Sequence, residues 1–362
     1  MKNSMLLLLL VFWAGFSCRK QAPAPASPSE PEAVVDVFTV NVDGLQLRAA
    51  PGPEGKTIRG LQLGESLTDL GEVSDFTTPV QLRGIAFNEP WLKIKTSKGE
   101  EGWVYGGALS FSSRGKSASV LLKKRLQTFF GEEVAQRIDA FRSDWETVSS
   151  SNALSACFLE SAGLKDELNA KLESGIQIRD SGELPDLFWL ETAIPGHIPQ
   201  LVAEGTVYTL FADYGAWRRR AEETEGKEDD AFFDLCIRFF PEDSIAYFFP
   251  AYFIQTWDYG GHSLLGRGIH RQLLSGLDRL FREKSPFTPE ILRMKTDLVN
   301  DITAAEGTYW EKQDAIIREL EGILEAKYPI LDKADLAALS TRLKQFQTPE
   351  KFSIVLNQQS GE

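Results

Sequence analysis

Hydrophobic residues change their spacing once along this chain, near residue 115, and the change divides it into two kinds of fold. Before that point apolar and polar residues alternate, as in residues 38–42 and 91–96, which is typical of strands with one buried face. After it, apolar residues recur at steps of three and four, which indicates helices. We therefore predict a small all-β barrel over residues 34–113, followed by a mainly α-helical domain over residues 114–362.

Start and stop signals place several helices in the second part. Thr288 and Pro289 form a typical helix start, because threonine caps helices and proline fits their first position. From there a period of about 3.6 residues runs to Lys327, and residues 332–346 form a last helix. Residues 176–178 are the best strand candidate in this part. Three glycines are expected to interrupt helices: Gly131, Gly163 and Gly307.

Four sequence blocks in the first part carry a family resemblance. They are residues 45–52 (LQLRAAPG), 58–67 (IRGLQLGESL), 91–96 (WLKIKT) and 102–105 (GWVY). In this order and spacing, the region over residues 36–110 resembles the bacterial SH3 domain, an SH3-like β-barrel. Residues 74–90 are longer than the usual link before the tryptophan strand, so we expect either an extended loop or an additional hairpin there.

The resemblance implies binding rather than catalysis, with cell-wall peptide, glycan or an envelope protein as the ligand. The candidate ligand contacts are Trp91, Trp103 and Tyr105, since aromatic rings offer apolar area together with a polar group. The alternative is that these three side chains only cover the core of the barrel. Arg48 is either part of the same surface or an ordinary solvated charge.

The first eighteen residues predict export. Lys2 is followed by an apolar run over residues 5–16 and then by Cys18, which is the layout of a secretory signal. With a cysteine at its end, this segment resembles a bacterial lipoprotein signal, and the resemblance implies cleavage before Cys18 and acylation of that residue, with palmitate among the attached chains. Plain secretory cleavage at the same bond is the alternative, because Gly15 and Ser17 are small. The apolar run is too short to span a bilayer core of about 30 Å.

A proline-rich segment follows the cysteine. We predict a signal peptide over residues 1–17 and a stiff, extended tether over residues 18–33 that holds the folded part away from a membrane. A polyproline ligand is the alternative function of this segment. The predicted location is the bacterial cell envelope, with the protein anchored by lipid and facing the periplasm or the exterior. The net charge of −13 argues against nucleic acid as a partner.

Few residues offer metal or nucleophilic chemistry. His262 and His270 are eight residues apart, and on one straight helix they would lie too far apart to share a zinc ion, so no metal and no cofactor is predicted. Two pairs supply the residue types of a cysteine peptidase, Cys157 with His197 and Cys236 with His262. Neither cysteine has the expected neighbours, so buried free thiols are the preferred interpretation and a disulfide is the alternative.

Several carboxylates in apolar surroundings are candidates for a lysozyme-like general acid. They are Glu191, Glu204, Asp213 and Asp258. No local motif of such enzymes accompanies them, so we predict no catalytic residue and a protein that binds rather than reacts. The alternative is a cell-wall hydrolase with its active site in the helical part.

Aromatic residues are concentrated over residues 232–259, where two interpretations stay open. The first is the core of the helical domain, and the second is an apolar groove that stacks sugars. A segment shortly before it, residues 217–220 (WRRR), is followed by Glu222 and Glu223. It predicts a solvated helix face with internal ion pairs.

Overall fold

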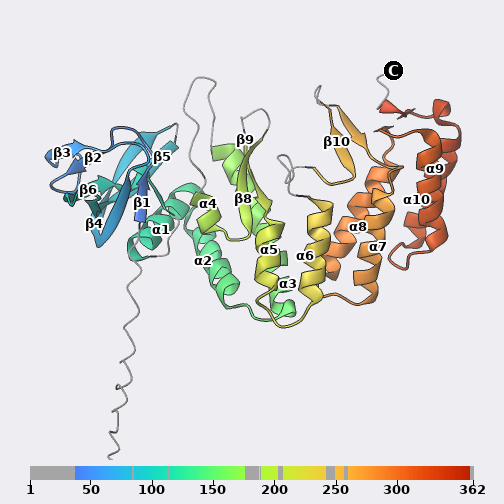
Figure 1. Cartoon of the computed structure of the whole chain (residues 1–362), viewed down its shortest axis with the longest axis horizontal. Coiled ribbons are helices and arrows are strands. Elements are labelled where there is room, and N and C mark those ends of the chain that lie inside the picture. The colour runs from blue at the N-terminus through green and yellow to red at the C-terminus, as the bar shows by residue number, and fades with distance from the viewer. Residues whose placement is uncertain are drawn as a thin grey trace, which may run out of the picture. The chain divides into compact units, whose positions relative to one another are not determined.

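The computed structural model, drawn in Figure 1, describes most of the chain after the predicted tether. The described residues are 37–83, 85–111, 115–175, 187, 189–202, 207–241, 249–256 and 260–358. Asp36–Glu362 form one compact unit, which is distinct from Met1–Val35. The predictions for the signal peptide, Cys18 and the tether lie outside the described residues, as does the predicted strand over residues 176–178.

The first part is a seven-stranded sheet in the order β3-β2-β6-β5-β4-β1-β7, in which every pair of neighbouring strands is antiparallel. Its strands are β1 Val37–Val40, β2 Gln46–Arg48, β3 Thr57–Gly60, β4 Ser66–Leu82, β5 Ile85–Thr96, β6 Glu101–Tyr105 and β7 Leu109–Phe111. Alternate residues fill its core, among them Phe38, Leu92 and Val104, each fully buried. The predicted SH3-like β region is confirmed, and we call residues 37–111 the β module.

The long segment before the tryptophan strand is an additional hairpin rather than a loop. Strands β4 and β5 stay paired from Leu67 opposite Thr96 to Leu82 opposite Ile85, with register shifts on either side of Val73. These irregularities bend the long strand. The predicted hairpin from Trp91 to Tyr105 is also present, because β5 pairs with β6 over these residues.

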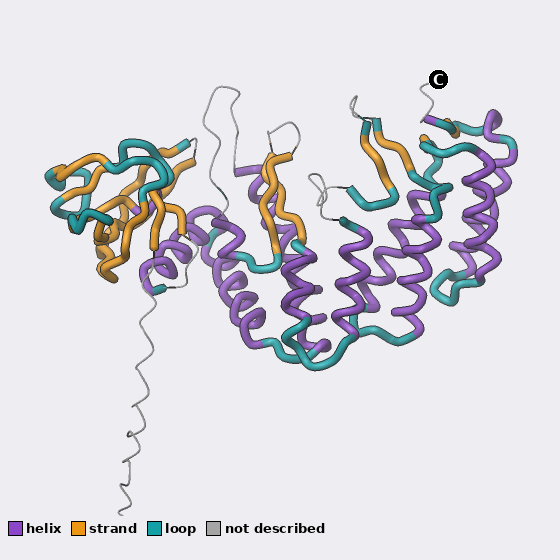
Figure 2. The backbone as a smooth tube through the Cα atoms, viewed as in Figure 1, coloured by secondary structure: helices purple, strands orange, loops and turns teal. Residues whose placement is uncertain are grey.

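The second part is mainly helical, as predicted, and Figure 2 shows its helices in purple. Within the described ranges the α-helices are α1 Lys116–Phe130, α2 Glu132–Thr147, α3 Ser151–Gly175, α4 Trp189–Ala193, α5 Tyr214–Ala221, α6 Glu228–Phe239, α7 Ile269–Arg282, α8 Thr288–Thr303, α9 Gln313–Ala326 and α10 Lys333–Gln347. None of these described helices is long and apolar enough to cross a membrane.

Two of the three glycine breaks are present. Gly131 separates α1 from α2 with a φ of 85°, in the region that glycine adopts most readily. Gly163 lies inside α3, so the break predicted there is wrong. A glycine inside a helix costs about 1 kcal/mol. Burial of Leu164, Leu168 and Leu172 on α3 outweighs that cost.

The C-terminal helical run is divided more than its sequence period indicates. Helix α8 begins at Thr288 with Pro289 in its first turn, but the Thr288 hydroxyl donates to the backbone oxygen of Ser285, 2.6 Å away, and does not cap the helix. Helix α8 ends at Thr303, and the short strand β12, Gly307–Thr308, pairs in parallel with β13, Ile354–Val355. The last helix agrees with the prediction, and Asp332 caps it.

Four further short strands were not predicted. They form two hairpins, β8 His197–Val202 with β9 Val207–Ala212, and β10 Phe253–Gln255 with β11 Gly261–Ser263. Figure 2 shows both in orange beside the helices. Proline at position 199 weakens the sequence pattern of β8, and three-residue strands are too short to show a period.

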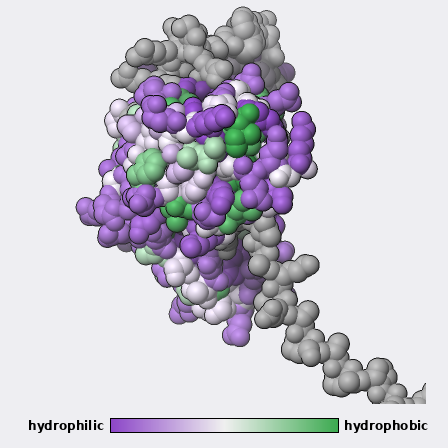
Figure 3. All heavy atoms as spheres, turned by 90° about the vertical axis from the view of Figure 1, so that its left-hand side faces the viewer, coloured by the Kyte–Doolittle hydropathy of each residue, from purple (hydrophilic) through white to green (hydrophobic). Residues whose placement is uncertain are grey.

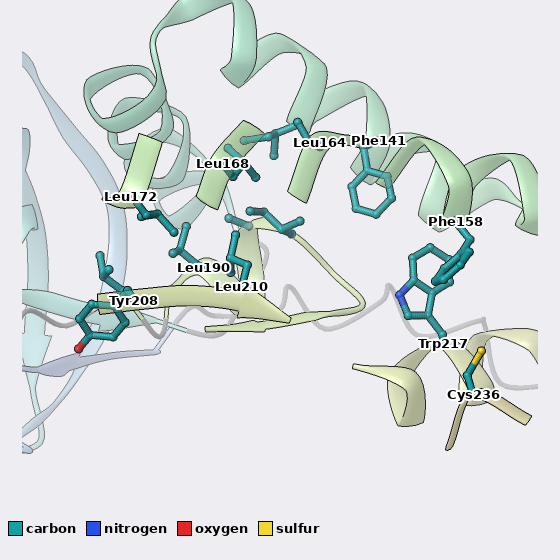
Figure 4. Close-up of a cluster of buried hydrophobic side chains, with 14 of the residues drawn as sticks. Phe141, Phe158, Leu164, Leu168, Leu172, Leu190, Tyr208, Leu210, Trp217 and Cys236 are labelled. Atoms are coloured by element: carbon teal, nitrogen blue, oxygen red, sulfur yellow. The ribbon is translucent and has the colours of Figure 1, made fainter. Parts of the chain in front are cut away.

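Aromatic side chains form the core of the helical part. Phe232 stacks on Phe287 with ring centroids 4.1 Å apart, and Trp217 stacks on Phe233 at 5.6 Å. Figure 4 shows Phe158 of α3 against Trp217, with the leucines of α3 facing Leu190 and Leu210. The core interpretation of residues 232–259 is therefore confirmed for its first helix, whereas residues 242–248 and 257–259 lie outside the described residues.

The segment over residues 217–220 is only partly the solvated face that was predicted. Trp217 is fully buried and Arg220 nearly so, because both side chains turn toward α2 and α3. The expected internal ion pairs are present, Arg218 with Glu222 at 3.2 Å and Arg220 with Glu223 at 3.1 Å, and Arg218 also pairs with Asp230 and Asp234 of α6 at 2.8 and 2.6 Å. The prediction missed the burial because three consecutive arginines are typical of an exposed helix face, although the tryptophan before them points to the core.

A buried ion pair joins the β module to the first helix. Arg125 of α1 donates from Nε to Oε1 of Glu89 on β5 at 2.6 Å, and both side chains are at most 2% exposed. Its Nη2 also donates to the backbone oxygens of Gly106 and Leu109. These bonds satisfy most of the donors of the guanidinium. The predicted boundary between residues 113 and 114 falls within 112–114, which lie outside the described residues.

Candidate functional site

The three predicted contact residues lie on one face of the β5–β6 hairpin. Trp91 is opposite Tyr105, and Lys93 is opposite Trp103, which also faces Arg48 of β2. Residues opposite one another in antiparallel strands share a face, and neighbours along a strand point to the other face. We call these five residues the outer aromatic face. The residues between them, such as Leu92 and Val104, fill the core of the sheet.

The long hairpin covers two of the three aromatic side chains. The Trp91 indole donates to the Thr78 hydroxyl at 2.9 Å, and the Tyr105 hydroxyl donates to the backbone oxygen of Thr78 at 2.8 Å. Ser74 accepts from the backbone nitrogen of Trp91 at 2.9 Å. Burial raises the pKa of Tyr105 well above its usual value. The polar groups of both rings are therefore bonded within the chain.

Trp103 is the least buried of the three predicted contact residues. It is half-buried, whereas Trp91 and Tyr105 are 5% and 4% exposed and meet edge to face with centroids 5.7 Å apart. The prediction that all three contact a ligand stays a prediction. Of the three, Trp103 is the residue whose ring a ligand can contact without displacing the long β4–β5 hairpin.

Arg48 links this face to the loop after β2. Its Nη1 donates to the backbone oxygen of Gly55 at 2.7 Å, and its guanidinium carbon lies 5.9 Å from the centroid of the Trp91 ring. A side-chain carbon on Gly52 would stand 3.5 Å from the Phe76 ring, so the loop also touches the long hairpin. Sequence reasoning left the role of Arg48 open and missed Phe76, although the unusual length of residues 74–90 pointed toward it.

The exposed part of the site combines charges of both signs with apolar surface. Lys93 bonds Glu72 at 2.6 Å, and this hydrogen bond raises the pKa of the lysine. Phe76 is 43% exposed. Figure 3, which looks toward the β module, shows hydrophobic side chains in separate patches among hydrophilic ones. Such a surface suits a ligand with both polar and apolar groups, such as a peptide or a sugar.

The cysteines lack the chemistry of a peptidase. Cys157 and Cys236 are buried free thiols, so the alternative of a disulfide is wrong. Burial raises the pKa of Cys157 to about 12 and that of Cys236 well above its usual value, whereas the reaction needs a thiolate. Burial also lowers the pKa of His197 to about 4. No hydrogen bond joins either thiol to a histidine in the part of the chain described by the structure.

The histidines are also placed differently from the expectation of one shared helix. His262 lies on β11 beside the Trp310 ring, and His270 lies on α7, where its Nε2 is 2.7 Å from Oδ2 of Asp301. Residues 264–268, with Gly266 and Gly268 at positive φ, separate the strand from the helix, so the two histidines do not share one helix. The described residues contain no group of three side chains placed to hold a metal ion.

Two of the four candidate carboxylates lie close enough to interact. Asp213 caps α5, where it accepts from the backbone nitrogen of Ala216 at 2.9 Å. Partial burial and then the charge of Asp213 raise the pKa of Glu191. Glu204 and Asp258 lie outside the described residues. Because Asp213 is engaged at a helix start, Glu191 is the remaining candidate for a general acid among the described positions.

The comparison with protein families identifies the first part of the chain. The family model of the bacterial SH3 domain matches residues 43–110, which run from the turn before β2 into β7. No curated protein and no solved structure matches the chain. The chain therefore contains a bacterial SH3 domain, and this suggests a cell-wall-binding module, since such domains commonly bind peptidoglycan.

Proposed function

We propose that this protein is a lipid-anchored component of the bacterial cell envelope whose SH3 domain binds cell-wall peptide or glycan without cleaving it. The observation that carries the proposal is the partly exposed ring of Trp103 beside Arg48 and Lys93, on the outer aromatic face of a bacterial SH3 domain. An aromatic ring suits peptides and sugars, because it offers apolar area together with a polar group. An envelope protein is the other ligand class that this surface fits.

Sedimentation with isolated cell-wall sacculi tests the binding. The full-length chain should sediment with the sacculi, and Trp103→Ala should weaken this binding by roughly tenfold or more, as central aromatic contacts do. Leu63→Ala is the matched control, because Leu63 is 59% exposed on the turn between β3 and β4. The control should bind like the parent chain. Equal binding by the parent chain and Trp103→Ala would remove this site from the proposal.

The anchor is tested separately. The apolar run over residues 5–16, which precedes Cys18, supports it, and acyl chains give stable attachment because each buried CH₂ contributes about 0.8 kcal/mol. Mass spectrometry of the protein from membranes should find acyl groups on an N-terminal Cys18. Cys18→Ser should move the protein to the soluble fraction. An unmodified amino terminus in the native product would contradict this part.

A hydrolase remains a second candidate function because of the raised pKa of Glu191 beside Asp213, which is a property of general acids. Release of soluble fragments from sacculi by the purified chain is its test, with Glu191→Gln as the variant. Fragment release that stops in Glu191→Gln would establish the hydrolase. Sacculi that stay intact with the parent chain would exclude it.

A further inference from the structure

A groove on the helical part is lined by four arginines. It has a volume of about 650 Å³ and lies between the end of α6, the exposed face of α7 and Tyr328 after α9. Helices α6 and α7 pack against each other. We call it the arginine groove; its polar lining includes Arg238, Arg271, Ser275, Arg279, Arg282 and Tyr328.

The helix period places these side chains together. On α7, residues 271, 275, 279 and 282 are separated by four, four and three positions, so they share one face. The opposite face carries leucines that are at most 3% exposed, such as Leu273 and Leu277. The outer face is therefore polar and available to solvent.

Two glycines let the neighbouring helices come close to this face. A side-chain carbon on Gly276 would stand 2.7 Å from Leu235 of α6, so the two helices meet there, and Arg238 follows one turn later. On the other side, a side-chain carbon on Gly322 of α9 would stand 3.1 Å from Nη1 of Arg271. Close contact on both sides shapes the arginine face of α7 into a groove.

Most of these arginines have no acidic partner. Arg282 bonds Asp278 at 2.8 Å, and Arg238 donates to the backbone oxygen of Asp234 at 3.3 Å. Within the described ranges, no carboxylate oxygen lies within 4.0 Å of the side-chain nitrogens of Arg238, Arg271 or Arg279. The chain has a net charge of −13, so these arginines, without a carboxylate partner among the described residues, form a local group of positive charge on an acidic protein.

A nearby carboxylate does not neutralise the groove. Glu319 is 6% exposed and accepts from the backbone nitrogens of Gly266, Gly268 and Arg271, at 2.6, 2.8 and 3.0 Å. These three hydrogen bonds hold the carboxylate against the backbone at the start of α7. The guanidinium groups of Arg271 and Arg279, which have no carboxylate partner among the described residues, are available to an external anion.

We propose that the arginine groove binds an elongated anion that carries several phosphate groups. A guanidinium forms paired hydrogen bonds with phosphate oxygens. Positions 271 and 282 are about 16 Å apart along the helix, since each residue adds about 1.5 Å, so a single phosphate cannot reach all four arginines. Tyr328 is the single aromatic side chain among the described lining residues, which disfavours a ligand that depends on base stacking.

The proposal is tested by calorimetry, which measures the binding of inorganic polyphosphate to the full-length Cys18→Ser chain. The double variant Arg271→Gln, Arg279→Gln should weaken binding by roughly tenfold or more, since charged hydrogen bonds are lost. The matched control is Lys123→Gln, Lys124→Gln on the exposed side of α1, which removes the same charge elsewhere. The control should bind polyphosphate like the parent chain.

Two further probes identify the source of the phosphate. Vesicles of phosphatidylglycerol report on lipid headgroups, and single-stranded DNA reports on a base-bearing polymer. Loss of binding to polyphosphate or to vesicles in the arginine variant alone supports the site and assigns the source. The proposal is overturned if neither phosphate probe binds, if both double variants lose binding equally, or if DNA binds as tightly as polyphosphate. Because Trp103 is unchanged in these variants, the outcome is independent of the proposed wall binding.

Discussion

Arginines in the β module and on the adjoining helix α1 are bonded within the chain, whereas Arg271 and Arg279 of the arginine groove have no carboxylate partner among the described residues. Arg125 lies fully buried against Glu89, and Arg48 holds the loop after β2. Arg271 and Arg279, in contrast, line an open groove without a carboxylate partner among the described residues. The difference separates arginines that stabilise the fold from arginines that are available to a ligand. Substitution of the first kind should lower the free energy of unfolding, and substitution of the second kind should weaken ligand binding.

The largest expected effect is on the buried pair. Arg125→Met leaves Glu89 buried without its partner, and breaking such a pair costs about 3–5 kcal/mol. The free energy of unfolding, measured with urea, should fall by that amount. The double variant Arg125→Met, Glu89→Met should recover a large part of the loss. A small effect of the single change would mean that this ion pair is not buried as the structure has it.

Buried neutral groups provide the next test, through pH. Burial lowers the pKa of His197 from 6.5 to about 4, so the unfolded chain binds a proton that the folded chain excludes between these values. The stabilising effect is therefore present above pH 6.5 and is lost as the pH falls toward 4, by up to about 3 kcal/mol. His197→Leu should flatten this part of the curve of unfolding free energy against pH. An unchanged slope in the variant would contradict the buried, neutral ring.

A smaller effect is expected where the long hairpin covers the outer aromatic face. Tyr105→Phe removes the bond to the backbone oxygen of Thr78, which should lower the free energy of unfolding by about 1 kcal/mol. Trp103→Ala is the comparison. Because its ring is partly exposed, this change should lower the free energy of unfolding by less than it weakens the free energy of wall binding. Equal destabilisation by both changes would make Trp103 a core residue rather than a contact residue.

The smallest effect on stability is expected in the arginine groove. The double variant Arg271→Gln, Arg279→Gln should change the unfolding free energy by less than about 0.5 kcal/mol, as exposed substitutions usually do. Urea unfolding of this variant and of Arg125→Met, measured side by side, gives the contrast directly. A large destabilisation by the groove variant would show that these arginines hold the fold together after all.

Local patterns were enough to predict the β module and the kind of fold that follows it. Alternation identified the hairpin from Trp91 to Tyr105, and the unusual length of residues 74–90 allowed the additional hairpin as one of two outcomes. What covers a face is not a local property. The pattern left open whether Trp91 and Tyr105 contact a ligand or only cover the core, and both are buried because Thr78 bonds them from a distant part of β4.

The arginine groove was beyond sequence reasoning for the same reason. Its residues come from α6, from α7 and from the segment after α9, and the close helix contacts depend on Gly276 and Gly322. The sequence shows that a helix contains a glycine, but it does not show which helix packs against that glycine or how close the two helices come. The hairpin of β10 and β11 was missed because three-residue strands are too short for a period to appear, and in β8 Pro199 weakens the pattern.

Oxidative footprinting of the outer aromatic face is the most direct test of the account. Hydroxyl radicals should modify Trp103 in the free chain, and soluble peptidoglycan fragments should protect it, as measured by mass spectrometry. Trp91 and Tyr105 should stay poorly modified in both states because the long hairpin covers them. Unchanged oxidation of Trp103 in the presence of the fragments, or strong oxidation of Trp91 in the free chain, would contradict the account.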